Sequence, residues 1–297
     1  MYLLHGVPVS NVVKRLASRT VLAARSLLTS GAGLLKETAL RVVHGPGALR
    51  CSVCGHSVRC FRTLSEFYFR QLKEAGWPYG FDQAETCNVR QYSCPYCGAA
   101  DRDRLLALFL GEWFRESTSP ALVIDFAPAQ PLSAFIRRQI AASGRAVQYR
   151  TADLMAAGVD DQVDITDMPR YATGSVDLWL CSHVLEHVVD DRKAMRELLR
   201  VLKPGGRGAV LVPIVLGLAE IDEDPTITDP TERWRRFGQD DHVRLYSKSG
   251  LVERLREVGF IVHEWGTDHF GAARFAELGI GPLSVLYVVE RPTVKFA

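Results

Sequence analysis

Four of the seven cysteines stand in two pairs whose spacing suits a metal ion. Cys51 and Cys54 form the first pair, Cys94 and Cys97 form the second, and a glycine follows each pair directly. A tight turn of this kind brings two thiolates together, and two such turns supply a tetrahedral set of four sulfurs. We expect these four residues to hold a structural zinc ion, because four thiolates leave no open position for catalysis.

The remaining cysteines leave alternatives open. The 39 residues between the two pairs exceed the usual spacing of a zinc ribbon, and Cys60 and Cys87 in that interval could replace a ligand or be core residues. Unpaired buried thiols and a redox dithiol are the other interpretations. An odd total does not suit a secreted disulfide framework, so we expect a reducing, cytoplasmic compartment.

Histidine is the side chain best suited to take up a proton near neutral pH. His183, His187 and His242 are the candidates in the second half of the chain. Residues 183–187 also spell H-x-x-E-H, a pattern of zinc peptidases, whose chemistry needs the motif on a helix, a third ligand and an open metal position. Because the motif follows a predicted strand here, we do not expect a peptidase.

The elements that must position these residues alternate from residue 101 onward, which predicts a parallel α/β sheet. The predicted helices span 102–116, 132–142, 190–202 and 249–258, and the predicted strands span 121–126, 147–151, 162–165, 176–181, 208–213, 260–265 and 284–290. Residues 214–243 are long, acidic and proline-containing, so we interpret them as an excursion over the active site.

Two segments of this half resemble class I S-adenosylmethionine-dependent methyltransferases. They are VDLWLCSHVLEH at 176–187 and RELLRVLKPGG at 196–206. The resemblance covers about residues 120–290, and within the family it is to methyltransferases of type 11. The whole chain is similar to bacterial methyltransferases with an N-terminal zinc ribbon. It implies a Rossmann-like, doubly wound sheet of seven strands preceded by a small zinc-ribbon module.

The family binds its cofactor outside the carboxyl ends of the strands. The resemblance implies that Asp125 faces the methionine ammonium, that Asp153 accepts from both ribose hydroxyls, and that Asp164 accepts from the adenine amino group. Ser182 and His183 would line the sulfonium and its methyl group. The other cofactor contacts implied by the resemblance are Phe126, Ala127, Leu154, Ile165 and Cys181.

One loop departs from the family pattern. Residues 125–130 read DFAPAQ, where the family has Asp-x-Gly-x-Gly. Ala127 is small enough for close approach to a ligand, but a positive φ at this residue would cost energy. The cofactor has no pyrophosphate to cradle, so the loss is compatible with binding; a catalytically degenerate protein is the alternative.

A hydroxyl acceptor must lose a proton during methyl transfer, and histidine suits this step. We predict His242, in the excursion, as the base, with Asp241 or Asp240 orienting its ring. His183 and His187 are the next candidates. The other interpretation of His242 is a structural loop histidine.

Composition divides the chain into three expected parts. Residues 1–50 carry seven Lys or Arg and one acid among apolar residues, which predicts basic amphipathic helices. They could touch anionic lipid, cover a substrate, serve as a targeting segment, or pack with the basic face in water. Residues 51–100 hold nine aromatic residues and should form the zinc-ribbon module with its own core, and residues 101–297 the methyltransferase domain.

The net charge of +2 gives no global field for a nucleic acid. We therefore expect methyl transfer to a hydroxyl of a sugar, glycolipid or secondary metabolite. An RNA methyltransferase that uses the ribbon as reader, and a zinc-organised interaction module without activity, are the alternatives. No apolar run is long enough to span a bilayer.

Overall fold

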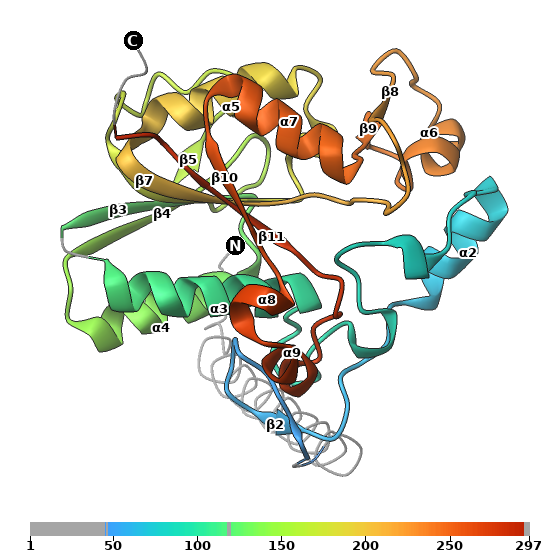
Figure 1. Cartoon of the computed structure of the whole chain (residues 1–297), viewed down its shortest axis with the longest axis horizontal. Helices are drawn as coiled ribbons and strands as arrows, with labels where there is room; N and C mark the ends of the chain where they lie inside the picture. Colours follow the sequence, from blue (N-terminus) through green and yellow to red (C-terminus); the bar gives the residue numbers. More distant parts are fainter. Residues whose placement is uncertain (1–44, 46, 118–119, 294–297) are drawn as a thin grey trace, which may run out of the picture.

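A seven-stranded sheet crosses the centre of the molecule (Figure 1). The computed structural model describes residues 45, 47–117 and 120–293. The strand order is β10-β11-β7-β6-β3-β4-β5, and only β11 runs antiparallel to its neighbours. The strands are β3 (Ala121–Phe126), β4 (Val147–Asp153), β5 (Asp161–Gln162), β6 (Val176–Ser182), β7 (Leu202–Leu211), β10 (Ile261–Trp265) and β11 (Leu286–Glu290). The chain winds outward in both directions from β3 and β6, so their carboxyl ends form the switch point of the sheet.

Helices cover both faces of this sheet (Figure 1). α3 (Asp101–Glu116), α4 (Gln130–Ser143), α8 (Thr267–Phe270) and α9 (Ala272–Leu278) lie on one face, and α5 (Asp191–Val201) and α7 (Lys248–Val258) lie on the other. Successive strand residues alternate between the two apolar clusters, as Val123 and Ile124 do on β3. The predicted doubly wound fold is therefore confirmed.

Most predicted boundaries agree with the structure, and the largest difference falls at β7. The predicted strand began at 208, whereas β7 begins at Leu202, directly after α5. The helix stops before Pro204 because proline cannot continue it, and Gly205 takes a left-handed φ of +75° within the start of β7. This start of β7 pairs irregularly with β6, with a register shift between Val176 and Leu178.

The cysteine-containing part does not have a separate core. It contains β1 (Leu49–Arg50), β2 (Ser57–Val58), α2 (Glu66–Ala75), η1 (Phe81–Gln83) and η2 (Val89–Gln91). Cys51, Val53 and Cys94 belong to the same apolar cluster as α3 and α4, which corrects the expectation of an independent core. Arg104 of α3 is fully buried and donates to backbone carbonyls of the cysteine part and of α9, including Ala99 and Leu278.

The excursion is folded rather than open. It contains β8 (Asp222–Glu223) and α6 (Pro230–Phe237), and β8 pairs with β9 (Arg244–Leu245). Its acidic residues are largely neutralised from within, since Arg236 pairs with Asp222 and Asp224. α6 lies beside α2 (Figure 1), so the excursion and the cysteine part meet at one side of the sheet.

The prediction of basic helices in 1–50 falls almost entirely on residues outside the described part of the chain. Within the described ranges, no helix is both long and apolar enough to cross a membrane.

Candidate functional site

The four predicted zinc ligands converge. The ligand atoms of Cys51, Cys54, Cys94 and Cys97 all lie within 4.8 Å of one another. The Sγ atoms of Cys51 and Cys97 are 3.8 Å apart, and those of Cys54 and Cys94 are 3.7 Å apart. Sulfurs at about 2.3 Å from a tetrahedral zinc ion are separated by about 3.8 Å. The four thiols therefore fit a zinc ion.

The two turns that carry these cysteines, 51–55 and 94–98, have the same geometry; we call them the knuckles. Gly55 and Gly98 both have φ of +79°, the left-handed conformation that glycine adopts at least cost. Each glycine amide donates to the carbonyl of the first cysteine of its pair, at 2.8 and 2.9 Å. The glycine after each C-x-x-C is thus required by the turn itself.

A cavity of about 830 Å³ opens at the carboxyl ends of β3, β4 and β6; we call it the strand-end cavity. Seven of the ten predicted cofactor contacts line it: Phe126, Ala127, Asp153, Leu154, Asp164, Ile165 and His183. Its position outside the switch point is where doubly wound folds bind nucleotide-like ligands.

Two carboxylates in this cavity are held by their own loops. Asp153 Oδ1 accepts from the amides of Met155 and Ala156, both at 2.8 Å. Asp164 Oδ1 accepts from the amide of Thr166 at 2.8 Å. These turns fix each side chain through one carboxylate oxygen.

Asp125 points away from the strand-end cavity. Side chains alternate along β3, so Asp125 points to the face of α4, whereas Phe126 faces the strand-end cavity. Its carboxylate accepts from Tyr149 Oη at 2.6 Å, and burial raises its pKa to about 7. Asp125 is therefore absent from the lining of this cavity, and its predicted contact with the methionine ammonium stays a prediction. Cys181 and Ser182 are also absent from the lining of this cavity, and Cys181 is fully buried.

Two strand ends adopt a strained backbone. Ala127 has φ of +52° and His183 has φ of +57°, and both residues line the strand-end cavity. A left-handed conformation costs a non-glycine residue about 1 kcal/mol or more. The predicted cost of replacing glycine in the loop after β3 is therefore confirmed at Ala127.

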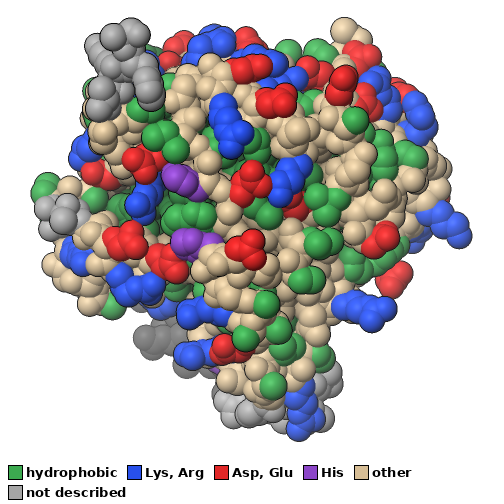
Figure 2. All heavy atoms as spheres, viewed as in Figure 1, with side chains coloured by type: hydrophobic (Ala, Val, Ile, Leu, Met, Phe, Trp, Pro, Cys, Tyr) green, Lys and Arg blue, Asp and Glu red, His purple; other side chains and the backbone are tan. Residues whose placement is uncertain are grey.

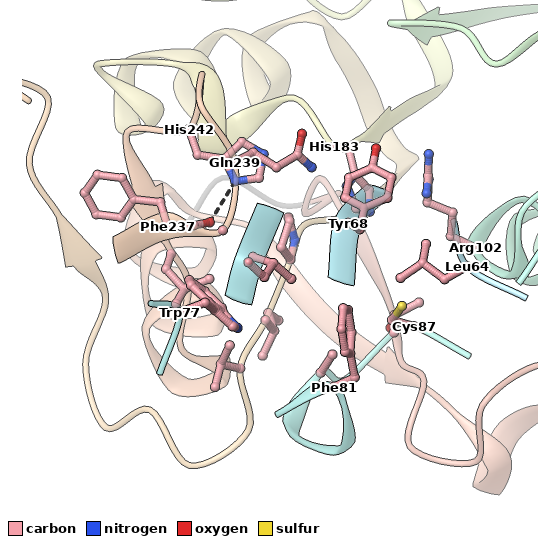
Figure 3. Close-up of a pocket in the computed structure, with 18 of the residues that line it drawn as sticks. Leu64, Tyr68, Trp77, Phe81, Cys87, Arg102, His183, Phe237, Gln239 and His242 are labelled. Atoms are coloured by element: carbon pink, nitrogen blue, oxygen red, sulfur yellow. Dashed lines mark hydrogen bonds between the residues drawn. The ribbon is translucent and has the colours of Figure 1, made fainter. Parts of the chain in front are cut away.

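A second cavity of about 340 Å³ lies between α2, the excursion and the end of β6; we call it the aromatic cavity. Figure 3 shows Trp77 and Phe81 on one side of it and His183, His242 and Arg102 on the other. About half of its lining comes from the chain between the knuckles: Leu64, Tyr68, Leu72, Trp77, Gly80, Phe81, Ala84, Thr86, Cys87 and Tyr92. The long segment between the two cysteine pairs thus encloses this cavity.

His183 and His187 line both cavities. His187 Nδ1 lies 3.3 Å from Asp241 Oδ2, so Asp241 pairs with His187 and not with His242 as predicted. No side-chain contact of Asp240 with His242 is present among the described residues. A histidine beside a carboxylate is the usual arrangement of a proton acceptor.

His242 lies at the aromatic cavity but is only 1% exposed. Its Nδ1 lies 3.1 Å from the carbonyl oxygen of Phe237 (Figure 3), and since a carbonyl only accepts, Nδ1 carries the hydrogen. Burial, with the charge of His187, lowers the pKa of His242 to about 4. The ring is therefore a weak base at neutral pH, which counts against the predicted role as base.

Two residues of this site were not predicted from the sequence. Glu186 is fully buried between the histidines, and burial raises its pKa to about 8. Arg102 at the start of α3 brings a guanidinium to the aromatic cavity and donates to Tyr92 Oη at 2.9 Å. The H-x-x-E-H pattern contained a signal for Glu186, but no local pattern marks Arg102.

The comparisons with known proteins agree with this architecture. The family model described as "Methyltransferase domain" matches residues 120–210, the part that runs from β3 through β7. Residues 120–210 are therefore similar to a methyltransferase domain, and this part of the chain provides most of the lining of the strand-end cavity. No curated protein sequence matches the chain.

Several solved structures are similar to this chain at low sequence identity. The methyltransferase domain (CMeT) of citrinin polyketide synthase is 14% identical, covering 68% of this chain and 55% of its own, with a TM-score of 0.45. The cyclase SpnF is 16% identical, covering 79% of this chain and 100% of its own, with a TM-score of 0.41. Phosphoethanolamine N-methyltransferase 2 of Haemonchus contortus is 14% identical, covering 66% and 53%, with a TM-score of 0.40.

Proposed function

We propose that this protein transfers the methyl group of S-adenosylmethionine to a hydroxyl of a small-molecule acceptor, such as a sugar, a glycolipid or a secondary metabolite. The observation that carries the proposal is that His183 and His187 line both cavities. A donor in the strand-end cavity and an acceptor in the aromatic cavity would meet at these two side chains, as in-line transfer requires.

The reaction assigns each group a task. The acceptor oxygen forms a bond to the methyl carbon, the bond from that carbon to sulfur breaks, and its electrons stay on sulfur to give S-adenosylhomocysteine. The proton of the hydroxyl passes to His187, which has Asp241 beside it, while His183 shapes the wall between the two cavities.

The shape and charge of the aromatic cavity support a small acceptor. Its volume of about 340 Å³ suits one ring system, and its aromatic side chains can pack on the face of a sugar or an aromatic ring. Lys and Arg alternate with Asp and Glu over the face drawn in Figure 2, without a continuous basic stripe. This distribution favours a metabolite over RNA, whose phosphates need such a stripe.

The zinc site belongs to the same proposal. A zinc ion bound by the knuckles would fix both ends of the segment that encloses the aromatic cavity, and so would organise the acceptor site without touching the chemistry.

The test is incubation of the purified chain with S-adenosylmethionine deuterated in its methyl group and separate metabolite, glycolipid and RNA pools. Mass spectrometry should find the label on an oxygen atom of a small molecule or glycolipid. Label recovered on RNA, on carbon or on nitrogen would overturn the proposed acceptor. A chain that does not bind S-adenosylhomocysteine in calorimetry would favour the degenerate interaction module.

A further inference from the structure

Glu186 is a buried carboxylate without a counter-ion in hydrogen-bonding contact. Its side chain is fully buried, and neither carboxylate oxygen has a hydrogen-bond partner among the described residues. Burying an unpaired carboxylate is unfavourable, so such groups are normally paired or coordinate a metal ion. A cation bound at this position would satisfy both carboxylate oxygens.

Three histidines surround this carboxylate. His183 Nδ1 lies 3.4 Å from Glu186 Oε1, and His242 Nε2 lies 4.0 Å from the same oxygen. One ligand atom each of Glu186, His187 and His242 lie within 4.8 Å of one another. His242 Nε2 is buried and also lacks a partner. Because the hydrogen of the His242 ring is on Nδ1, Nε2 has a lone pair. That lone pair lies near Glu186 Oε1, which is also a hydrogen-bond acceptor.

The outer contacts of these histidines are those of metal ligands. His242 donates from Nδ1 to the Phe237 carbonyl, which leaves Nε2 free to bind. His187 Nδ1 lies 3.3 Å from Asp241 Oδ2, which leaves its Nε2 free in the same way. A histidine that binds a metal typically donates its other ring nitrogen to a carbonyl or a carboxylate.

The turn that carries two of the ligands is rigidly held. Glu186 and His187 lie in η3 (Leu185–His187), and the Glu186 carbonyl accepts from the Val243 amide at 3.0 Å. The buried Arg244 donates to the carbonyls of Leu185 and Val188 on either side of these ligands. The set is preorganised by β9, which also adjoins His242.

We propose that Glu186, His187 and His242 bind a divalent transition-metal ion, separate from the cysteine site. Two imidazoles and one carboxylate suit Zn²⁺, Fe²⁺ or Mn²⁺ and leave coordination positions open. Ligand atoms at about 2.1 Å from one ion lie about 3.0–3.5 Å apart, so the three side chains must close slightly.

The open positions face the aromatic cavity, which His187 and His242 line. This part of the inference rests on the proposed function: the ion would bind the acceptor through adjacent hydroxyl oxygens, as in a diol or a catechol. A metal-bound hydroxyl is a stronger acid, so water in the aromatic cavity would take its proton, and His187 would act as a ligand instead of a base.

The test is a Co²⁺ titration of the reduced, metal-free full chain, followed by absorption spectroscopy. Thiolate-bound Co²⁺ gives intense near-ultraviolet bands, whereas a site of nitrogen and oxygen donors gives only weak visible bands. Wild type should bind two ions per chain, one of each kind. Glu186→Gln and His187→Asn should weaken only the second ion, by at least about tenfold.

His269→Asn is the matched control, because His269 Nε2 pairs with Glu112 at 2.9 Å on the surface. This variant should bind both ions as wild type does. Wild type that binds only the thiolate-bound ion, or a second ion that neither substitution at the site weakens, would overturn the metal site. Methylation that proceeds equally well in Glu186→Gln would overturn acceptor coordination while leaving the proposed function intact.

Discussion

The strand-end cavity and the aromatic cavity share two histidines but are built in different ways. The first is assembled from the ends of neighbouring parallel strands, each followed by a short loop. The second is assembled from chain as distant as Leu64, His183 and Leu245. Almost all of the lining of the first comes from the strand ends and the segments after them, with Asp241 of the excursion added, whereas the second exists only when the segment between the knuckles and the excursion are both in place.

Loss of a knuckle cysteine should separate the two cavities most clearly. Cys54→Ser should release zinc and lower turnover by about 10³-fold, because the segment that encloses the aromatic cavity loses its anchor. The dissociation constant of S-adenosylhomocysteine should change by less than about threefold, since no cysteine of the cluster lines the strand-end cavity. Cys60→Ser is the control within the same segment. Equal losses of turnover and cofactor binding would show that the cavities are not independent.

The next largest effect on turnover is expected at His187, which lines both cavities. His187→Gln should lower the single-turnover rate by about 10²-fold, because a proton acceptor or ligand between donor and acceptor is removed. Cofactor affinity should stay within about threefold of wild type. The exposed His263 of β10, mutated to Gln, is the control. A rate unchanged in His187→Gln would place the chemistry at another side chain.

Glu85 couples the segment between the knuckles to the sheet, and its ionisation should make that coupling depend on pH. Its carboxylate accepts from Tyr287 Oη of β11 at 2.9 Å, and burial raises its pKa to about 7. The folded state thus holds a proton that the unfolded state has lost, so this contribution to stability falls as pH rises from about 4.5 to about 7.

Glu85→Gln removes the pH-dependent contribution of this carboxyl to the free energy of unfolding. Relative to wild type, its free energy of unfolding should rise by about 2 kcal/mol between about pH 5 and pH 8, as measured by urea denaturation. Glu277→Gln, at an exposed position, serves as the control. A difference between Glu85→Gln and wild type that does not change with pH would contradict the buried, protonated carboxyl.

Asp153 tests the strand-end cavity alone. Asp153→Ala should weaken S-adenosylhomocysteine by about tenfold or more in calorimetry, because a charged acceptor for the ribose hydroxyls is lost. Asp160→Ala is the matched control, since Asp160 also caps a backbone amide of this region, that of Thr151, but does not line the cavity. Similar losses in both variants would assign Asp153 to loop structure only.

The smallest effect is expected at the strained loop. Ala127→Gly should raise the free energy of unfolding by about 0.5–1 kcal/mol, because glycine adopts a φ of +52° without strain. Ala141→Gly on the exposed side of α4 should lower it by a similar amount. A loss of stability in Ala127→Gly would mean that the alanine methyl packs usefully at this point.

The sheet could be predicted from sequence because its signals are local. β3 occupies the predicted residues 121–126, and the cost of a missing glycine at Ala127 follows from the loop pattern alone. Buried apolar runs and turn residues carry this information within a few positions. The same holds for the knuckles, whose ligands and glycines lie within five residues of each other.

The aromatic cavity could not be predicted because its contacts are tertiary. Asp241 is adjacent to His242 in sequence yet pairs with His187, since burial of His242 turns neighbouring side chains in different directions. Glu186 lies near His242, which is 56 residues away in sequence, and its carbonyl accepts from the amide of Val243. The hydrophobic periodicity of a sequence does not indicate which distant segment covers the end of a strand.

The two knuckles close a loop of 39 residues at a single point. For a flexible loop with fixed ends, doubling its length costs only about 0.6 kcal/mol of chain entropy. Insertions or exchanges within this loop would therefore be tolerated by the sheet beneath it. Natural variation in this segment would remodel the aromatic cavity as one unit and leave the strand-end cavity unchanged.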